Sequence, residues 1–161
     1  MGLVLAEEGL VVAPVLRGRR VAELRHAAGL TQTQLADGVG VALQARISQW
    51  ERGVEQPSAR FVAALADALH VTPLEILNVD ISDPPLSALR LAAGLSMADV
   101  VRIAGIPYAT YNRIENGKVR SEPAAELLIS LASALSVTTE CVRLSISRAR
   151  RDHESHRIGV E

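Results

Sequence analysis

The sequence has little of what several protein classes require. It contains one cysteine, so no internal disulfide can form and a reducing compartment is indicated. The aromatic residues are one Trp, two Tyr and one Phe, which is few for a β-sandwich but adequate for small helical bundles. No run reaches the roughly 18 apolar residues that a membrane helix needs. The apolar opening MGLVLAEEGLVVAPV has no basic flank and contains two Glu, unlike a signal peptide, so we expect a cytoplasmic protein without membrane contact.

The sequence also lacks an excess of positive charge, since its net charge is −1. The distribution of charge is more informative than the sum. Residues 16–79 hold seven Arg against six acids, and residues 86–150 hold eight basic residues against five acids. Local basic faces are therefore compatible with this composition, and binding to nucleic acid is expected to depend moderately on salt.

No arrangement of residues typical of catalysis is present. We find no Ser, His and acid set, no paired carboxylates and no phosphate-binding glycine loop, and we therefore predict that the protein is not an enzyme and has no cofactor. His153 and His156 have a spacing that is compatible with metal binding on a helix. No third ligand accompanies them, so we predict no metal site.

An internal duplication is the strongest positive signal. ELRHAAGLT at residues 23–31 aligns with ALRLAAGLS at 88–96, WERG at 50–53 with IENG at 114–117, and LADALHVT at 65–72 with LASALSVT. The repeat predicts two domains, at residues 16–79 and 86–147. We expect an apolar N-terminal arm (1–15), a linker (80–85) that tethers the domains loosely, and a frayed polar C-terminal tail (148–161).

The apolar spacing within each copy is helical. Val21, Leu24 and Ala28 recur on one face of a helix, and Gly29 is placed to end it. Each copy then shows an N-cap, a glycine-containing turn, a further helix, and a proline that starts a fourth; the N-caps are Thr31 and Ser96. Thr72 and Pro73 start a short fifth helix. The predicted fold is all-α, with two tandem bundles of about five helices each.

The strings GLTQTQLADGVGV, RISQWERGVEQPS and LADALHVTPLEIL closely resemble the XRE or lambda-repressor-like helix-turn-helix family. This resemblance covers almost all of residues 16–77. In the second copy, GLSMADVVRIAGIPYATYNRIENGK matches the family's spacing with less typical residues. The resemblance implies that the third helix of a domain enters the major groove of double-stranded DNA while the second lies across the backbone.

In the first copy, Ile47 and Trp50 are predicted to point inward from the third helix. The outward positions are then our candidates for base contacts, namely Gln44, Ala45, Arg46, Ser48 and Gln49. One extra residue between Val41 and Ile47 leaves open whether the helix begins at Ala42, Leu43 or Gln44. The resemblance implies phosphate contacts from Thr31, Gln32 and Arg52, and it implies that Gln32 buttresses the reading helix.

In the second copy, Tyr111 and Ile114 are predicted to point inward. The candidates for base contacts are Tyr108, Ala109, Asn112 and Arg113, and those for phosphate contacts are Asn116 and Lys118. Met97 replaces the glutamine of the first copy, so that phosphate contact is missing. Tyr108 has two alternative roles, which are contact with a thymine methyl or phosphate and packing against a neighbouring domain.

These patterns predict a sequence-specific DNA-binding transcriptional regulator, more specifically a repressor. One chain supplies two different reading helices for a two-part site. The alternative is that only the first domain binds DNA, and that a degenerate second domain serves dimerisation or holds a protein partner, as in an antitoxin. The N-terminal arm is a second candidate for contact with another chain.

Overall fold

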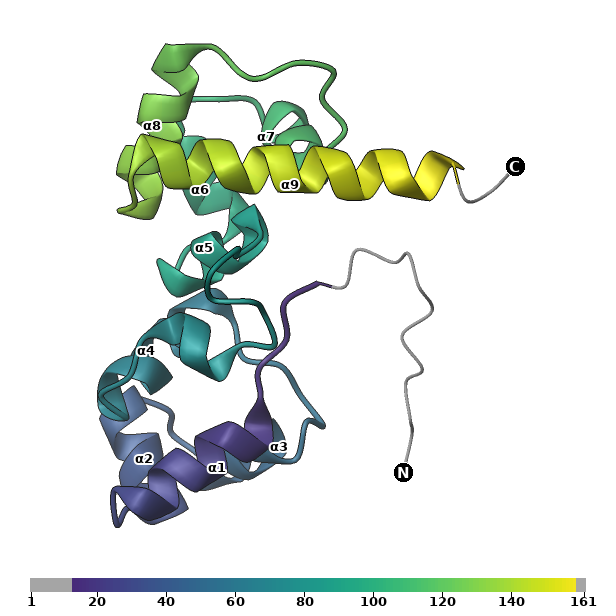
Figure 1. The fold of residues 1–161 in the computed structure, drawn as a ribbon. Helices are drawn as coiled ribbons and strands as arrows, with labels where there is room; N and C mark the ends of the chain where they lie inside the picture. Colours follow the sequence, from purple (N-terminus) through teal and green to yellow (C-terminus); the bar gives the residue numbers. More distant parts are fainter. Residues whose placement is uncertain (1–12, 159–161) are drawn as a thin grey trace.

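Two helical bundles lie one above the other in Figure 1, a computed structural model that describes residues 13–158. The first bundle consists of α1 (Gly18–Ala27), α2 (Gln32–Val39), α3 (Gln44–Glu51), α4 (Ala59–Ala68) and the 3₁₀ helix η1 (Pro73–Ile76). The second consists of α5 (Leu86–Ala92), α6 (Met97–Ala104), α7 (Tyr108–Glu115), α8 (Ala125–Leu135) and α9 (Thr139–Ile158). Residues 13–158 form no β-strand, and the predicted all-α fold is confirmed.

The hydroxyl residues that the sequence predicts as N-caps, Thr31 and Ser96, do cap α2 and α6. Thr31 Oγ1 accepts a hydrogen bond from the Gln34 N–H at 3.1 Å, and the Gln34 side chain accepts one from the Thr31 N–H at 2.8 Å. Ser96 and Asp99 form the same reciprocal pair, at 3.2 and 2.9 Å. Both helices end at a left-handed glycine, with φ of 75° at Gly40 and 67° at Gly105. These caps set the lengths of α2 and α6, the helices that precede α3 and α7.

The first bundle packs around Trp50, which is 1% exposed. Its ring lies 5.3 Å from the Phe61 ring. Aliphatic side chains from every helix of the bundle complete the core, among them Val21, Leu35, Ile47, Val62, Leu65 and Ile76. This core holds one face of α3 against the domain and leaves the other face outward.

The second bundle repeats this arrangement with different side chains. Tyr111 and Ile114 of α7 occupy the positions that Ile47 and Trp50 hold in α3, and both are buried. Around them lie aliphatic residues of α5, α6, α8 and α9, among them Leu86, Val100, Leu128, Leu131, Val142 and Ile146. The duplicated sequence therefore produces two separate cores.

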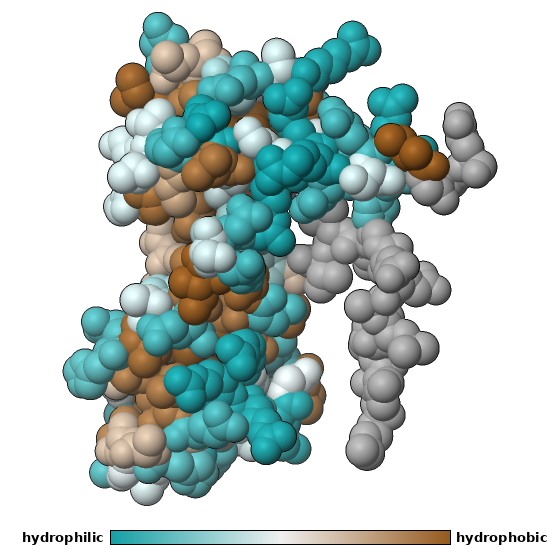
Figure 2. Space-filling view, in the orientation of Figure 1, coloured by the Kyte–Doolittle hydropathy of each residue, from teal (hydrophilic) through white to brown (hydrophobic). Residues whose placement is uncertain are grey.

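The two domains pack against each other through α4 and α5, which corrects the expectation of a loose tether. Ala88 of α5 belongs to the core of the first domain. A β-carbon on Gly94 would lie 3.2 Å from the β-carbon of Ala63, so the backbones come close. The linker is also held, because Ser145 Oγ donates to the Pro84 carbonyl at 2.8 Å. In Figure 2, hydrophobic residues gather near this junction, while most of the visible surface is hydrophilic.

Residues 148–158, expected as a frayed tail, form the second half of α9 instead. Figure 1 shows this helix extending past the rest of the domain. Its first half is buried in the core at Val142 and Ile146, so the helix is already nucleated where the polar stretch begins. Arg150 then donates to the Arg120 carbonyl at 3.0 Å. A search for an apolar stripe overlooks such a helix because its stripe ends halfway.

The chain enters the first bundle beside η1. Leu16 and Leu77 form an isolated antiparallel bridge. The Arg17 N–H donates to the Ile76 carbonyl at 2.8 Å, and the Asn78 N–H donates to the Val15 carbonyl at 3.0 Å. The last residues of the predicted N-terminal arm are thus fixed to the first domain. Residues 1–12 of that arm lie outside the described residues.

Candidate nucleic-acid interface

The predicted reading helix of the first domain, α3, begins at Gln44, which decides among the three alternatives left open by the sequence. Leu43 precedes it in extended conformation, with φ −124° and ψ 117°. Val41, directly after the turn glycine, is buried. The extra residue of this copy is therefore accommodated in the turn between α2 and α3, and the register of α3 follows the sequence prediction.

The predicted faces of α3 agree with the burial pattern. Ile47 and Trp50 are buried, whereas Gln44, Ala45 and Arg46 are exposed and Ser48 and Gln49 are half-buried. Arg46 is not wholly free, because its guanidinium lies 3.2 Å from the Glu55 carboxylate. The helix therefore presents short polar side chains outward, and a partner would have to displace Glu55 from Arg46.

A chain of side-chain hydrogen bonds connects the start of α2 to the start of α3. Gln44 Nε2 donates to Gln32 Oε1 at 2.8 Å, and Gln32 Nε2 donates to Glu51 Oε2 at 2.9 Å. The buttress that the resemblance implies for Gln32 is present in the structure. Both the oxygen and the nitrogen of the Gln32 amide are engaged in hydrogen bonds. Gln32 therefore restrains the orientation of the Gln44 amide.

Glu51 also belongs to a buried ion pair that the sequence analysis missed. Arg25 Nε donates to Glu51 Oε1 at 2.6 Å and Arg25 Nη2 to Glu51 Oε2 at 3.0 Å, and each side chain is only 7% exposed. Arg25 Nη1 also donates to the Leu30 carbonyl at 2.9 Å. The arginine thus joins α1, the loop after it and the end of α3. Ala28, predicted to share a helix face with Val21 and Leu24, is exposed and follows α1 as its C-cap.

The contacts of this pair set the charge states of both groups. The hydrogen bond to Glu51 raises the pKa of Arg25 further above neutrality. Burial by itself would raise the pKa of Glu51, but hydrogen bonds from Arg25 and Gln32 outweigh it and leave that pKa below its ordinary value. Both groups are therefore charged at neutral pH.

The second domain contains an equivalent ion pair between Arg90 and Glu115. Arg90 donates to the two carboxylate oxygens of Glu115 at 2.9 Å each, and its third donor reaches the Leu95 carbonyl at 3.2 Å. The signal for both pairs is in the aligned repeats, where an Arg and a Glu recur in register. Hydrophobic periodicity identifies only the apolar residues of a helix face. It therefore does not reveal a charged residue that is buried on that face, and both pairs were missed.

The faces of α7 also follow the prediction. Tyr111 and Ile114 are buried, Tyr108, Ala109 and Arg113 are exposed, and Asn112 is half-buried. Burial raises the pKa of Tyr111, so this phenol stays protonated. Asn116 Nδ2 donates to both the backbone carbonyl and Oδ1 of Asn112, at 2.8 and 3.0 Å. Asn112 and Asn116 are therefore coupled, and Asn116 restrains the Asn112 amide.

At the first position of α7, the glutamine pair of the first domain is replaced by Met97 and Tyr108. Tyr108 Oη donates to Met97 Sδ at 3.4 Å. Tyr108 is 53% exposed, so it does not pack against a neighbouring domain within residues 13–158. The outward position is compatible with a contact to a thymine methyl or phosphate, which stays a prediction.

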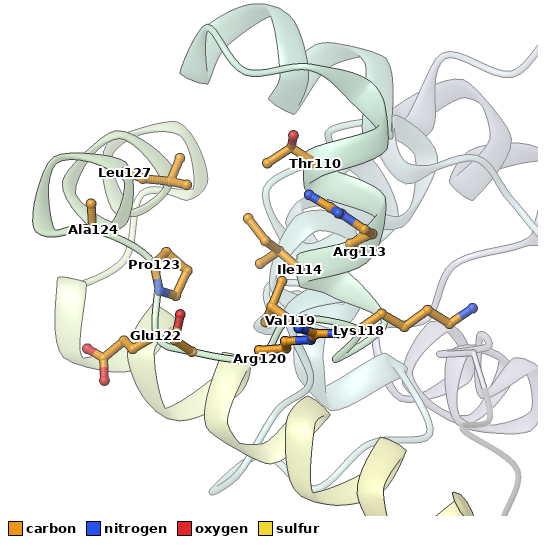
Figure 3. A pocket seen from close by; sticks show the side chains of 11 residues that line it. Thr110, Arg113, Ile114, Lys118, Val119, Arg120, Glu122, Pro123, Ala124 and Leu127 are labelled. Atoms are coloured by element: carbon orange, nitrogen blue, oxygen red, sulfur yellow. The ribbon is translucent and has the colours of Figure 1, made fainter.

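The predicted phosphate ligands lie at the ends of α2, α3 and α7. Thr31 caps α2 through its side-chain oxygen, and Arg52 donates to the Ser48 carbonyl at 3.2 Å. A hollow of about 540 Å³ lies beside α7. The loop at residues 118–124 bounds its other side (Figure 3). Arg113 on the helix and Lys118 and Arg120 on the loop belong to its lining. In Figure 3 the Lys118 side chain extends away from the hollow. Arg120 is a cation of this region that the sequence analysis did not single out.

No group of three His, Cys, Asp or Glu side chains that could hold a metal ion occurs in the described part of the chain. Within residues 13–158, no single helix is long and apolar enough to cross a membrane. The helices α8 and α9 reach that length and hydropathy only together, and the chain bends by 105° between them.

Both helical domains match models of known protein families. A family model described as a helix-turn-helix domain matches residues 18–77, and one described as helix-turn-helix matches residues 86–140. No curated protein and no solved structure matches the chain significantly. The two matched regions contain the α2 to α3 and α6 to α7 units described above, and domains of this type bind DNA. The chain belongs to the XRE or lambda-repressor-like helix-turn-helix family and carries two of its domains in tandem.

Proposed function

We propose that the chain is a transcriptional repressor that reads a two-part DNA site with α3 and α7. The observation that carries this proposal is the shared construction of the two helices. Each is eight residues long, is anchored by two buried side chains and directs polar groups outward. The major groove of B-form DNA admits one α-helix, and base edges there are distinguished by hydrogen bonds from such groups.

In the first domain, Gln44 and Gln49 are the principal base-reading residues. A glutamine amide pairs with the N6 and N7 atoms of adenine through one donor and one acceptor. Gln44 gives one N–H to Gln32 and keeps a second N–H and its oxygen for that purpose. Ala45, Arg46 and Ser48 lie on the same outward side, and Thr31, Gln32 and Arg52 contact phosphates.

In the second domain, Arg113 and Asn112 are the principal base-reading residues. An arginine guanidinium matches the O6 and N7 acceptors of guanine, and an asparagine amide matches adenine. Arg113 is exposed on α7, whereas the Asn112 amide is oriented by Asn116. Tyr108 and Ala109 lie next to them, and Asn116 and Lys118 contact the backbone.

Because the domains pack through α4 and α5, one chain presents two unlike reading helices in a fixed relationship. Binding of one domain then places the second at a high effective concentration near its own element. We therefore expect an asymmetric site covered by a single chain. A chain bound to such a site near a promoter would exclude other proteins from that DNA, and this exclusion is the proposed basis of repression.

Selection of bound sequences from a random duplex library, followed by footprinting with the full chain, tests this proposal. We expect a non-palindromic consensus with two elements. Gln49→Ala should relax preference at one position of one element, and Arg113→Ala should do so in the other, each with a loss of about 1–3 kcal/mol. A palindromic site occupied by two chains would reject the proposal that a single chain covers the site. If both variants keep the base preferences of the wild-type chain, the residue assignments are wrong.

A second candidate function is favoured by the apolar surface at the start of α7. Tyr108 is exposed and contacts the half-buried Met97. A protein partner or a second copy of the chain would cover such a surface. Sedimentation of the full chain and of Tyr108→Ala, without DNA, tests this alternative. A dimer that the substitution dissociates would support it, and a monomer in both cases removes the dimer.

A further inference from the structure

The two domains differ at the residue that begins the reading helix, although that helix is eight residues long in both and follows an eight-residue helix with the same type of cap. Gln44 begins α3 and Tyr108 begins α7. Each contacts the first residue of the preceding helix, which is Gln32 in α2 and Met97 in α6. The first domain thus has two amides in contact, with 2.8 Å between nitrogen and oxygen. In the second domain both residues differ, and a phenol oxygen lies 3.4 Å from a thioether sulfur.

The exchange changes what each helix offers to a base. The Gln44 amide is held at one N–H and keeps a donor and an acceptor free. The only donor of Tyr108 is its hydroxyl, which is directed to the Met97 sulfur. What Tyr108 presents outward, at 53% exposure, is therefore mainly the apolar surface of its ring.

Only one base edge in the major groove of unmodified DNA carries an apolar group, which is the C5 methyl of thymine. We propose that Tyr108 reads this methyl group, so that the second domain prefers a 5-methylpyrimidine where the first domain prefers adenine. The inference rests on the proposed function, because it requires α7 to lie in the groove. It also means that 5-methylcytosine is recognised at this position almost as well as thymine, since both carry the same methyl group.

A contact between Tyr108 and phosphate is the less favourable reading. Such a contact would use the hydroxyl as donor, which first requires breaking its interaction with Met97. The cations that suit phosphate, Lys118 and Arg120, lie beyond the other end of α7. The ring therefore lies at the opposite end of α7 from Asn116 and Lys118, the proposed phosphate ligands of the second domain.

Replacing single thymines in the selected duplex by uracil tests the inference, because uracil lacks only the methyl group. Binding of the full chain is measured by fluorescence anisotropy for each replacement. We expect one position in the second element where uracil weakens binding about fourfold, the value of one buried methyl group. At that position, 5-methylcytosine should bind better than cytosine by a similar factor.

Two variants show whether the effect arises from Tyr108. Tyr108→Phe keeps the ring and should keep the difference between thymine and uracil, whereas Tyr108→Ala should abolish it. If Tyr108→Phe instead weakens binding to all duplexes equally, the side chain contacts phosphate and the inference is wrong.

Exchanging the pair provides the sharpest test. In Met97→Gln with Tyr108→Gln, the second domain receives the residues of the first, and we expect preference at this position to change from thymine to adenine by roughly 5-fold or more. The position read by Gln49 in the first domain serves as the internal control and should not change. Absence of sequence-specific binding by the wild-type chain would overturn the proposed function. Specific binding with equal affinity for thymine and uracil at every position would overturn this inference alone.

Discussion

Arg25 and Glu51 form a two-point ion pair inside the first domain, with each side chain 7% exposed. Glu51 is the last residue of α3, and its second oxygen also receives the Gln32 side chain, which in turn holds Gln44. The charge buried between α1 and α3 is therefore connected to the first residue of the reading helix. Stability of the domain and orientation of the Gln44 amide depend on the same carboxylate.

Arg25→Met should destabilise the first domain by about 3–5 kcal/mol, because it leaves the Glu51 carboxylate buried without its cation. Urea unfolding followed by fluorescence measures this loss in the first domain specifically, since Trp50 is the only tryptophan and lies in that core. Replacing Arg25 and Glu51 together by Met should recover most of the loss, because no unpaired charge remains. A change below about 1 kcal/mol in the single variant would show that the pair contributes little.

The pair also predicts how stability depends on pH. Since the folded pKa of Glu51 lies below its ordinary value of 4.5, the unfolded chain takes up the proton first as the pH falls. The contribution of Glu51 is thus complete well above pH 4.5 and is lost as the pH falls through the folded pKa. Glu51→Gln should flatten the dependence of Trp50-detected unfolding free energy on pH in this range. Glu75, whose pKa is also lowered, is present in both proteins and cancels in the comparison.

These predictions also show which parts of the structure the sequence could reveal. The caps at Thr31 and Ser96 and the buried faces of α3 and α7 were predictable because each depends on neighbours within a few residues. The Arg25 and Glu51 pair could not be found from local patterns, since it joins residues 26 apart and places charge on a face where periodicity predicts apolar groups. Only the recurrence of both residues in the two repeats indicated it. The packing of α5 on α4 depends on small residues such as Ala88 and Gly94, which carry no signal of a partner.

The extension of α9 predicts a difference between two equivalent glycines. Gly53 and Gly117 follow the reading helices with φ of 70° and 69°, so alanine is strained at both positions. At Gly53 no atom lies within 4 Å of an added β-carbon, whereas at Gly117 that carbon would overlap the backbone of Ala149 in α9. Gly53→Ala should therefore cost about 1 kcal/mol, the backbone strain alone.

Gly117→Ala should cost clearly more, roughly 2–4 kcal/mol, because the substitution also displaces α9 from the end of α7. Thermal unfolding of both variants by circular dichroism compares them directly. The same loss in both variants would mean that α9 does not pack on Gly117 in solution.

Lys118 gives a last prediction, which separates phosphate contact from base reading. A cation that neutralises one phosphate releases about one counterion, so Lys118→Gln should weaken binding similarly for specific and unrelated duplexes. The slope of log affinity against log salt should become shallower by about 0.9, without a change in the selected consensus. Arg143→Gln removes the same charge from α9, where Arg143 pairs with Glu140, and should leave the slope nearly unchanged. Equal slopes for Lys118→Gln and the wild-type chain would place Lys118 away from the DNA, and with it the loop that follows α7.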